Sequence, residues 1–188
     1  MKTFHPAIAA RLFPRETALR NVGLVIFAAA LTAACAQASI PAIPVPFTLQ
    51  TMAVTLAGLT LGWRLAIWSQ ITYIAAGCAN MPVFANGESG IAKLVGPTGG
   101  YLVAFIVAAG FLGYVTERGF VRNAIDLTST LIAANFMILA IGTAWLAWYV
   151  PQGSAMNLGF YPFITGALVK SLVVVAMLPA AKRLVKSR

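Results

Sequence analysis

Charged side chains are scarce in this sequence of 188 residues: they make up 9% of it, only four of them are acidic, and 60% of the residues are apolar. A soluble domain carries about 25% charged residues, so a soluble fold is excluded. Residues 21–63 and 127–169 contain no charged side chain at all. Because about 20 apolar residues cross a bilayer, each of these runs has room for two crossings. The charge-free runs 65–87 and 94–116 have room for one crossing each.

Cysteine and histidine are also scarce. Cys35 and Cys78 both lie in apolar runs, where we expect small packing residues and no disulfide. The single histidine, His5, is in the N-terminal tail. The sequence offers no metal-ligand cluster, no catalytic set and no phosphate-binding loop. We therefore expect no metal or other cofactor, no enzymatic activity and no ATP hydrolysis by the chain itself.

Proline, glycine and the few charges divide the apolar sequence into six predicted spans. The spans cover about residues 21–40, 48–62, 64–80, 99–116, 126–149 and 162–181. They predict an all-α integral membrane protein with a single domain over residues 1–188: a tail of residues 1–20, a six-helix bundle over 21–181 and a tail of 182–188. Ala36-Gln37-Ala38 resembles a signal-peptidase site, but the apolar run is long and continues beyond it, which favours a retained first helix.

The basic residues predict the orientation. Six spans put both termini on one side of the membrane, and all but two of the 13 Lys and Arg residues fall on that side: Lys2, Arg11, Arg15, Arg20, Arg64, Arg118, Arg122, Lys182, Arg183, Lys186 and Arg188. Positive charge marks cytoplasmic loops, so both tails are predicted to be cytoplasmic. Lys93 lies in an outer loop, and Lys170 lies within the last span.

Lys170 is the first candidate for a functional residue. One interpretation is a lysine that reaches the headgroups along its flexible stem. The alternative is a charge kept inside the bundle for an anionic ligand, because ionisable residues within spans are costly and often mark ligand pathways. Spans two, four and six begin at the outer face, and helix N-termini favour anions. An apolar outward-facing pocket for a carboxylate is the resulting hypothesis.

Three further segments have open interpretations. The stiff apolar segment Pro44–Gln50 (PVPFTLQ) ends in an amide, Gln50, that pairs with a ligand or with a neighbouring helix. The segment Gly96–Tyr101 (GPTGGY) is a turn with an N-cap threonine, or a place where a ligand approaches the backbone beside the Tyr101 hydroxyl. The third is a strip of small residues at helical spacing in span one, which packs inside the bundle or against a partner helix: Ala30, Ala34 and Ala38.

Four motifs, in this order and spacing, resemble the BioY family: Pro44–Gln50, Met81–Ala85 (MPVFA), Gly96–Tyr101, and Pro162–Gly166 (PFITG) followed by Lys170. BioY proteins are the biotin-binding S components of energy-coupling-factor (ECF) vitamin transporters. The resemblance runs from span one to span six. It implies the ECF S-component fold, a biotin site near the outer face with lid loops, multi-pass insertion in the bacterial cytoplasmic membrane, and high-affinity biotin uptake.

The resemblance also implies partners and site residues. Docking through the alanine strip to a transmembrane T component with two ATPase subunits is implied, as is the alternative that the chain works alone. The substrate-binding residues implied are Phe47, Gln50, Asn86, Glu88, Gly100, Tyr101 and Lys170. One feature departs from the family pattern: an acid usually stands one turn before the lysine, and here that position is Ala167.

Two other functional classes remain open from the sequence. A small intramembrane enzyme acting on a lipid or isoprenoid substrate usually needs several acids or a metal cluster at the membrane face, and the four acids here are scattered. A helper subunit without a ligand predicts no small-molecule binding at all.

Overall fold

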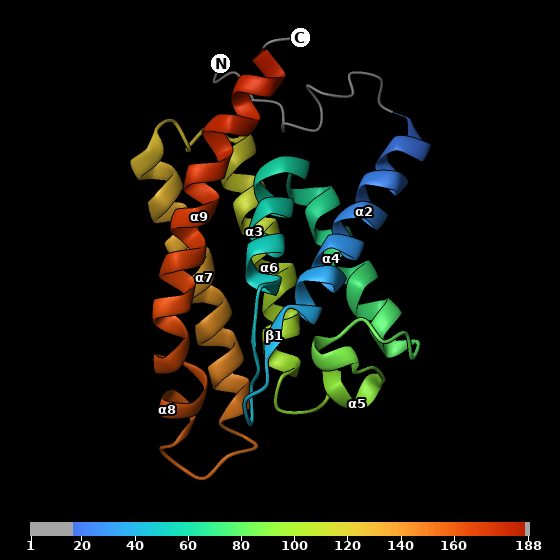
Figure 1. Cartoon of the computed structure of the whole chain (residues 1–188), viewed down its shortest axis with the longest axis vertical. Coiled ribbons are helices and arrows are strands. Elements are labelled where there is room, and N and C mark those ends of the chain that lie inside the picture. Colours follow the sequence, from blue (N-terminus) through green and yellow to red (C-terminus); the bar gives the residue numbers. More distant parts are fainter. Residues whose placement is uncertain (1–16, 187–188) are drawn as a thin grey trace.

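The computed structural model describes residues 17–186, with side chains as far as Met177, and shows an all-helical bundle with one small β-ribbon (Figure 1). The predicted tail residues 1–16 and 187–188, including His5, lie outside this range. The longer helices are α2 (Ala18–Gln37), α3 (Gln50–Leu61), α4 (Trp63–Cys78), α6 (Gly99–Glu117), α7 (Ala124–Leu146) and α9 (Tyr161–Lys186). Each of the six predicted spans corresponds to one of these helices.

The connections contain short elements of their own. They hold β1 (Ser39–Ile40), β2 (Phe47–Thr48), the 3₁₀ turn η1 (Ala85–Gly87), α5 (Ile91–Leu94) and α8 (Ala155–Gly159). The two strands pair antiparallel, with Ser39 opposite Thr48 and Ile40 opposite Phe47. This ribbon brings the end of α2 beside the start of α3.

Helices α2 and α9 differ in their bounds from the predicted spans. Helix α2 begins at Ala18, earlier than the predicted residue 21, because the Thr17 side chain caps it by accepting a hydrogen bond from the Arg20 N–H at 3.2 Å. It ends at Gln37, earlier than residue 40, because the chain turns into β1. Helix α9 continues through Lys186 and does not end at residue 181.

Four stretches within residues 17–186 are long and apolar enough to cross a membrane: Ala18–Gln37, Gly99–Glu117, Ala124–Leu146 and Ala155–Met177. Helices α3 and α4 are shorter, with 12 and 16 residues. At 1.5 Å per residue they reach about 18 and 24 Å, less than a bilayer core of about 30 Å. The chain is therefore a membrane protein with several apolar helices, and the count of six crossings stays a prediction.

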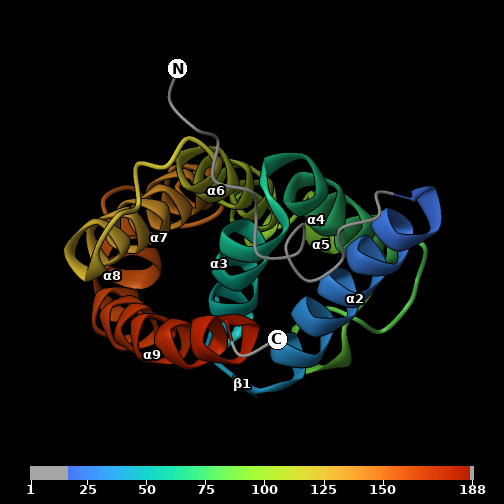
Figure 2. The ribbon, with the colours of Figure 1, turned by 90° about the horizontal axis from the view of Figure 1, so that it is seen from above.

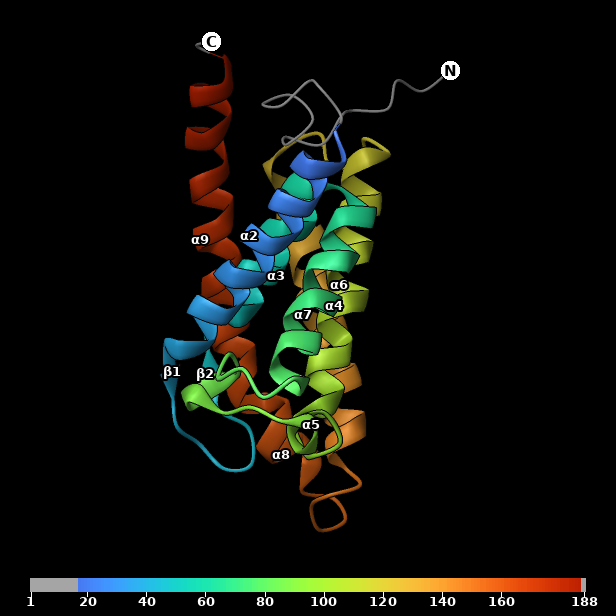
Figure 3. The same cartoon turned by 90° about the vertical axis from the view of Figure 1, so that its right-hand side faces the viewer.

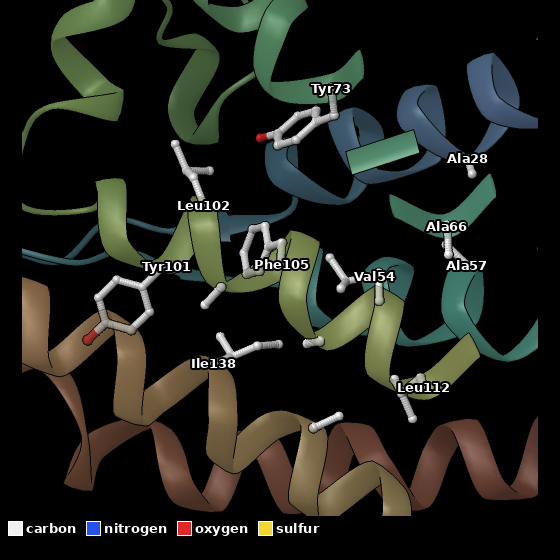
Figure 4. Packing of buried hydrophobic residues seen from close by; sticks show 14 of the residues in the cluster. Ala28, Val54, Ala57, Ala66, Tyr73, Tyr101, Leu102, Phe105, Leu112 and Ile138 are labelled. Atoms are coloured by element: carbon white, nitrogen blue, oxygen red, sulfur yellow. The ribbon is translucent and has the colours of Figure 1, made fainter. Parts of the chain in front are cut away.

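Helix α3 lies at the centre of the bundle. Viewed along the bundle, α2, α4, α6, α7 and α9 surround it (Figure 2). Most of its residues are buried, and Gly58 allows a close approach to α6: a Cβ atom there would lie 2.7 Å from Leu112 Cβ. Val54 of α3 packs in one cluster with Phe105 of α6 and Ile138 of α7 (Figure 4). These contacts make one half of the bundle a close-packed core.

The two ends of the bundle differ. The start of α2, the α3–α4 turn at Gly62, the α6–α7 connection and the end of α9 lie at one end (Figure 1). The β-ribbon, α5 and α8 lie toward the other end (Figure 3). Helix α3 occupies only the part of the bundle nearer the first end, whereas α6, α7 and α9 continue past its N-terminus toward the second end.

Polar side chains link neighbouring helices inside this apolar bundle. Gln70 of α4 donates to the hydroxyl of Thr32 of α2 at 3.4 Å. Asn135 of α7 donates to the hydroxyl of Ser171 of α9 at 3.1 Å. Hydrogen bonds of this kind between membrane helices contribute about 0.6 kcal/mol each, so they fix which helix faces meet more than they stabilise the bundle.

Candidate ligand-binding site

A cavity of about 610 Å³ lies at the N-terminus of α3, within the roughly 300–1,000 Å³ typical of small-molecule sites. Helices α3, α4, α6, α7 and α9 contribute to its lining, together with residues 41–48 and the 84–98 segment. Most of the lining side chains are apolar or aromatic: Leu102, Phe105, Ile138, Leu139 and Phe163, with Pro41, Pro44 and Pro46. The cavity therefore suits a ligand that is largely uncharged.

Gln50, the first residue of α3, is 6% exposed and lines this cavity. Its side-chain N–H donates to the Tyr73 hydroxyl of α4 at 2.6 Å, and its carbonyl oxygen accepts from the Thr48 hydroxyl at 2.9 Å. Of the two partners left open by the sequence, the structure shows the neighbouring helix. The amide is nevertheless at the cavity surface, beside the helix N-terminus.

Lys170 is half-buried and lines the same cavity. Its ammonium donates to the Thr48 carbonyl oxygen at 2.9 Å, so the side chain is directed into the bundle and not outward to the headgroups. It forms no salt bridge within the described residues. Glu88, the carboxylate that lines the cavity, pairs with Lys93 at 2.5 Å. The cavity therefore has one ammonium group that is not balanced by a carboxylate.

The 84–93 segment is connected to the end of α2. Gln37 donates to the Phe84 carbonyl oxygen at 3.0 Å, and the Ser39 hydroxyl donates to Asn86 at 2.8 Å. Asn86 adopts a left-handed backbone conformation with φ of 60°, which asparagine tolerates better than most residues. These contacts position Asn86 and Glu88 at the cavity.

Tyr101, near the start of α6, is positioned by contacts on two sides. Its hydroxyl donates to the Gly159 carbonyl oxygen at 2.7 Å and lies 3.3 Å from the Thr143 hydroxyl. Its ring packs on α7 at Gly142, where a Cβ atom would lie 2.2 Å from the ring. The expected N-cap bond is absent: the Thr98 backbone is helical, with φ of −89° and ψ of −8°, and not extended as at a typical N-cap. The Thr98 hydroxyl donates to the Lys93 carbonyl oxygen.

Five of the seven residues predicted to bind substrate line the cavity: Gln50, Asn86, Glu88, Tyr101 and Lys170. Phe47 and Gly100 do not line it. The Phe47 ring stacks on Phe163, with 4.3 Å between centroids, and so supports a lining residue. Gly100 packs against Trp145, leaving no room for a side chain because a Cβ atom would lie 2.2 Å from Trp145 Cβ. Binding by each of the seven stays a prediction.

Three polar lining residues lie outside both the predicted site residues and the four motifs: Thr51, Tyr73 and Lys93. Lys93 is the one basic residue predicted in an outer loop, and its position near Glu88 was a usable signal. Tyr73 is a polar aromatic residue within an apolar span, which is a weaker signal. Nothing in the sequence distinguishes Thr51 from the other threonines of the spans.

The alanine strip lies on the outer side of α2. Ala30 and Ala34 are exposed, whereas their neighbours Ala28 and Ala29 are buried against the bundle. Ala38, also exposed, is the residue that follows the helix, so the helical part of the strip ends at Ala34. The strip is thus available to a partner helix or to lipid.

Among the described residues, no group of three His, Cys, Asp or Glu side chains is arranged to hold a metal ion. What the site offers is an apolar cavity, a helix N-terminus, a lysine without a carboxylate partner and a set of amide and hydroxyl groups. The fold and this site define a class: helical membrane proteins that enclose one small, mainly apolar ligand bearing an anionic group.

Comparison with known proteins gives the family. The BioY family profile matches residues 8–187. A probable biotin transporter BioY of Pyrococcus horikoshii is 42% identical over 83% of this chain and 92% of its own length. A biotin transporter BioY of Thermotoga maritima is 39% identical over 79% of this chain and 87% of its own length. This chain belongs to the BioY family.

A solved structure has the same fold. The S-component for biotin from an ECF-type ABC transporter superposes with a TM-score of 0.77, covering 90% of this chain and 95% of that chain, at 24% sequence identity. The predicted S-component fold is thereby confirmed, and the family resemblance found in the four motifs is confirmed by the family match. The relatives are named as transporters, not as enzymes.

Proposed function

We propose that this chain binds biotin and serves in biotin uptake as the substrate-binding subunit of an ECF-type transporter. The observation that carries the proposal is the cavity at the α3 N-terminus, in a member of a family whose relatives are named biotin transporters. Biotin combines an apolar bicyclic ring and alkyl chain with a ureido group and a single carboxylate. The cavity offers an apolar lining, several hydrogen-bonding groups and one ammonium without a carboxylate partner.

Charge supports a monoanionic ligand. Three side chains that line the cavity carry a formal charge, Lys93, Lys170 and Glu88, which leaves one net positive charge. Because Lys93 and Glu88 already pair with each other, the excess charge is on Lys170. An α-helix N-terminus adds about half a positive charge, and α3 begins beside Lys170.

We further propose six crossings with both ends in the cytoplasm of a bacterium. The short helices α3 and α4 would cross together with the connections that flank them. This topology is supported by Arg20, Arg64, Arg118 and Arg122, which all lie near helix ends at the same end of the bundle. The cavity and its connections would then face outward, where biotin arrives.

The proposed partners are a transmembrane T component and two ATPase subunits, with the chain acting alone as the alternative. The chain has no phosphate-binding loop of its own, so energy has to come from elsewhere. Exposed Ala30 and Ala34 on α2 are the surface proposed for the T component, because small residues let two helix backbones approach closely.

Calorimetric titration of the purified full-length chain with biotin, in detergent or nanodiscs, tests the proposal. We expect a submicromolar Kd at one site per chain, which corresponds to more than about 8 kcal/mol. A monodisperse helical sample that shows no binding to biotin would refute the function. An uptake assay in cells with and without a T component then separates the two partner alternatives.

A further inference from the structure

A second cavity, of about 170 Å³, lies between the neighbouring helices α7 and α9 (Figures 1 and 2). Its lining residues begin at Ile132 and end at Leu139 on α7, and they begin at Ile164 and end at Ser171 on α9. On both helices they follow the spacing i, i+3, i+4 and i+7, which places them on one helix face. Two such faces form a groove that runs along the helices for about 10 Å, at 1.5 Å per residue. We call it the α7–α9 groove.

The α7–α9 groove is open to the outside of the bundle. Phe136 and Leu168, which line it, are 59% and 43% exposed. Both helices belong to stretches that are long and apolar enough to cross a membrane, Ala124–Leu146 and Ala155–Met177. The lining residues of α7 lie in the middle of the first stretch. The groove therefore opens to the hydrocarbon of the bilayer and not to the headgroups.

The chemistry of the groove excludes a polar occupant. None of the described residues that line it is charged, and its polar residues Asn135 and Ser171 are 5% and 3% exposed. The Asn135 amide donates to the Ser171 hydroxyl and to the Leu131 carbonyl oxygen, both at 3.1 Å. The Ser171 hydroxyl in turn donates to the Ala167 carbonyl oxygen at 2.8 Å. The side-chain donors are thus already used, and what remains for an occupant is apolar surface.

A groove of this size and lining favours an apolar guest. An apolar cavity of about 150 Å³ stays dry and binds small apolar molecules. Lining atoms that face a void lose dispersion contacts, which a guest restores. In the hydrocarbon of a bilayer the available guests are acyl chains, and the groove runs along two membrane-crossing helices, which is also the direction in which acyl chains extend.

We propose that the α7–α9 groove binds one acyl chain of a membrane phospholipid. The chain packs between the exposed rims at Phe136 and Leu168, over the small side chain of Ala167, which leaves the room for it. The groove shares only Leu139 with the candidate ligand-binding cavity, so the lipid site is separate from that cavity. The inference does not depend on biotin being the ligand there.

The test compares Ala167→Phe with Ala176→Phe in the full-length chain. Phenylalanine at position 167 fills the groove. Ala176 is the matched control, because it is an exposed alanine of α9 that does not line the groove. Each chain is reconstituted in nanodiscs of phosphatidylcholine, of which a small share carries a diazirine in the middle of one acyl chain. After irradiation, mass spectrometry gives the adduct yield at each residue. Native mass spectrometry of detergent-purified samples gives the number of phospholipids retained per chain.

The expected result is opposite to the order of exposure. Leu172, next to the groove on α9, is 61% exposed, whereas Ile164 in the groove is 36% exposed. A bound acyl chain should nevertheless label Ile164 at least threefold more than Leu172. Ala167→Phe should lower the Ile164 adduct at least threefold and the retained phospholipid by about one per chain. Ala176→Phe should change neither quantity.

Two results would overturn the inference. Adduct yields that follow exposure, with an unchanged lipid count in Ala167→Phe, would mean that lipid only passes over this surface. Crosslinks between two copies of the chain at Phe136 or Leu168 would mean that a second copy covers the groove. Should Ala167→Phe not fold, Ala167→Leu provides the same comparison with a smaller added volume.

Discussion

Lys170 and Lys93 both line the cavity, but only Lys93 has a carboxylate partner, Glu88. This difference predicts unequal effects of removing the two charges. In Lys170→Met the apolar stem is retained and the ammonium is lost, so the ligand's carboxylate loses its charge partner. Two unit charges about 4 Å apart attract by about 4 kcal/mol at an effective dielectric constant of about 20. Truncating one member of a desolvated charge pair costs about 2–5 kcal/mol.

We therefore expect Lys170→Met to weaken biotin binding by about 3 kcal/mol, which is roughly a hundredfold increase in Kd. Lys93→Met removes a lysine whose side chain is 39% exposed and already paired. Exposed ion pairs contribute about 0–1 kcal/mol, so this variant should change the Kd less than about fivefold. Glu88→Gln should have a similarly small effect, because it breaks only the same exposed pair.

The assay is calorimetric titration of the three variants with biotin and with biotin methyl ester. The ester should bind Lys170→Met and the unmodified chain with nearly equal affinity. If Lys170→Met weakens both ligands equally, the lysine supports the pocket through its bond to the Thr48 carbonyl and does not bind the carboxylate. If Lys93→Met has the larger effect, the anionic end of biotin lies at the 84–93 segment, and the charge argument is wrong.

Other predictions follow from the packing around the cavity. Replacing exposed Ala30 or Ala34 with Trp should lower biotin uptake in cells that contain a T component while leaving the Kd of the purified chain unchanged. Ala133→Trp, at an exposed alanine of α7, is the control. A loss of biotin binding parallel to the loss of uptake would assign the strip to packing within the bundle. Gly142→Ala should lower both the Tm and the biotin affinity, because the new Cβ atom would lie 2.2 Å from the Tyr101 ring. Overpacking of this kind destabilises a protein by about 1–3 kcal/mol. An unchanged Tm would show that the ring moves freely. Tyr73→Phe should destabilise the chain by about 1–3 kcal/mol, because it leaves the buried Gln50 amide without its hydrogen-bond partner. The double variant Gln50→Leu with Tyr73→Phe should lose less stability than the sum of the losses in the two single variants.

The positions of the helices were predictable because each is bounded by charge, proline or glycine. The apolar run 127–169, for example, contains most of α7 and the first part of α9, which are separated by the segment around Pro151 and Gly153. The short second helix was also expected, since only the residues between Pro46 and Gly62 were available to it. Charge alone identified Lys170, because one lysine in a long apolar run has few explanations.

The contacts across the cavity were not predictable from spacing. Gln50 and Tyr73 meet because α3 and α4 lie side by side, and Glu88 meets Lys93 through the path of an irregular segment. The Phe47 ring stacks on Phe163, a contact that brings the β-ribbon against α9 and that the spacing of the two residues in the sequence does not indicate. The direction of a side chain at a helix start or in a two-residue strand depends on the neighbouring element, and no local pattern contains that information.

The close-packed half of the bundle around α3 bears on the permeability of the membrane. Four side chains of α3 are each 3% exposed or less: Ala53, Val54, Ala57 and Leu59. Gly58 also brings α3 against α6. The cavity is therefore closed at its inner end and does not continue as a channel. A chain of this kind, embedded in the membrane without a partner, should leave the ion gradients of the cell intact whether or not a ligand occupies the cavity. Liposomes that contain the chain should therefore hold a proton gradient as long as empty liposomes do. Binding of a scarce nutrient would then cost the cell none of the energy stored in its ion gradients.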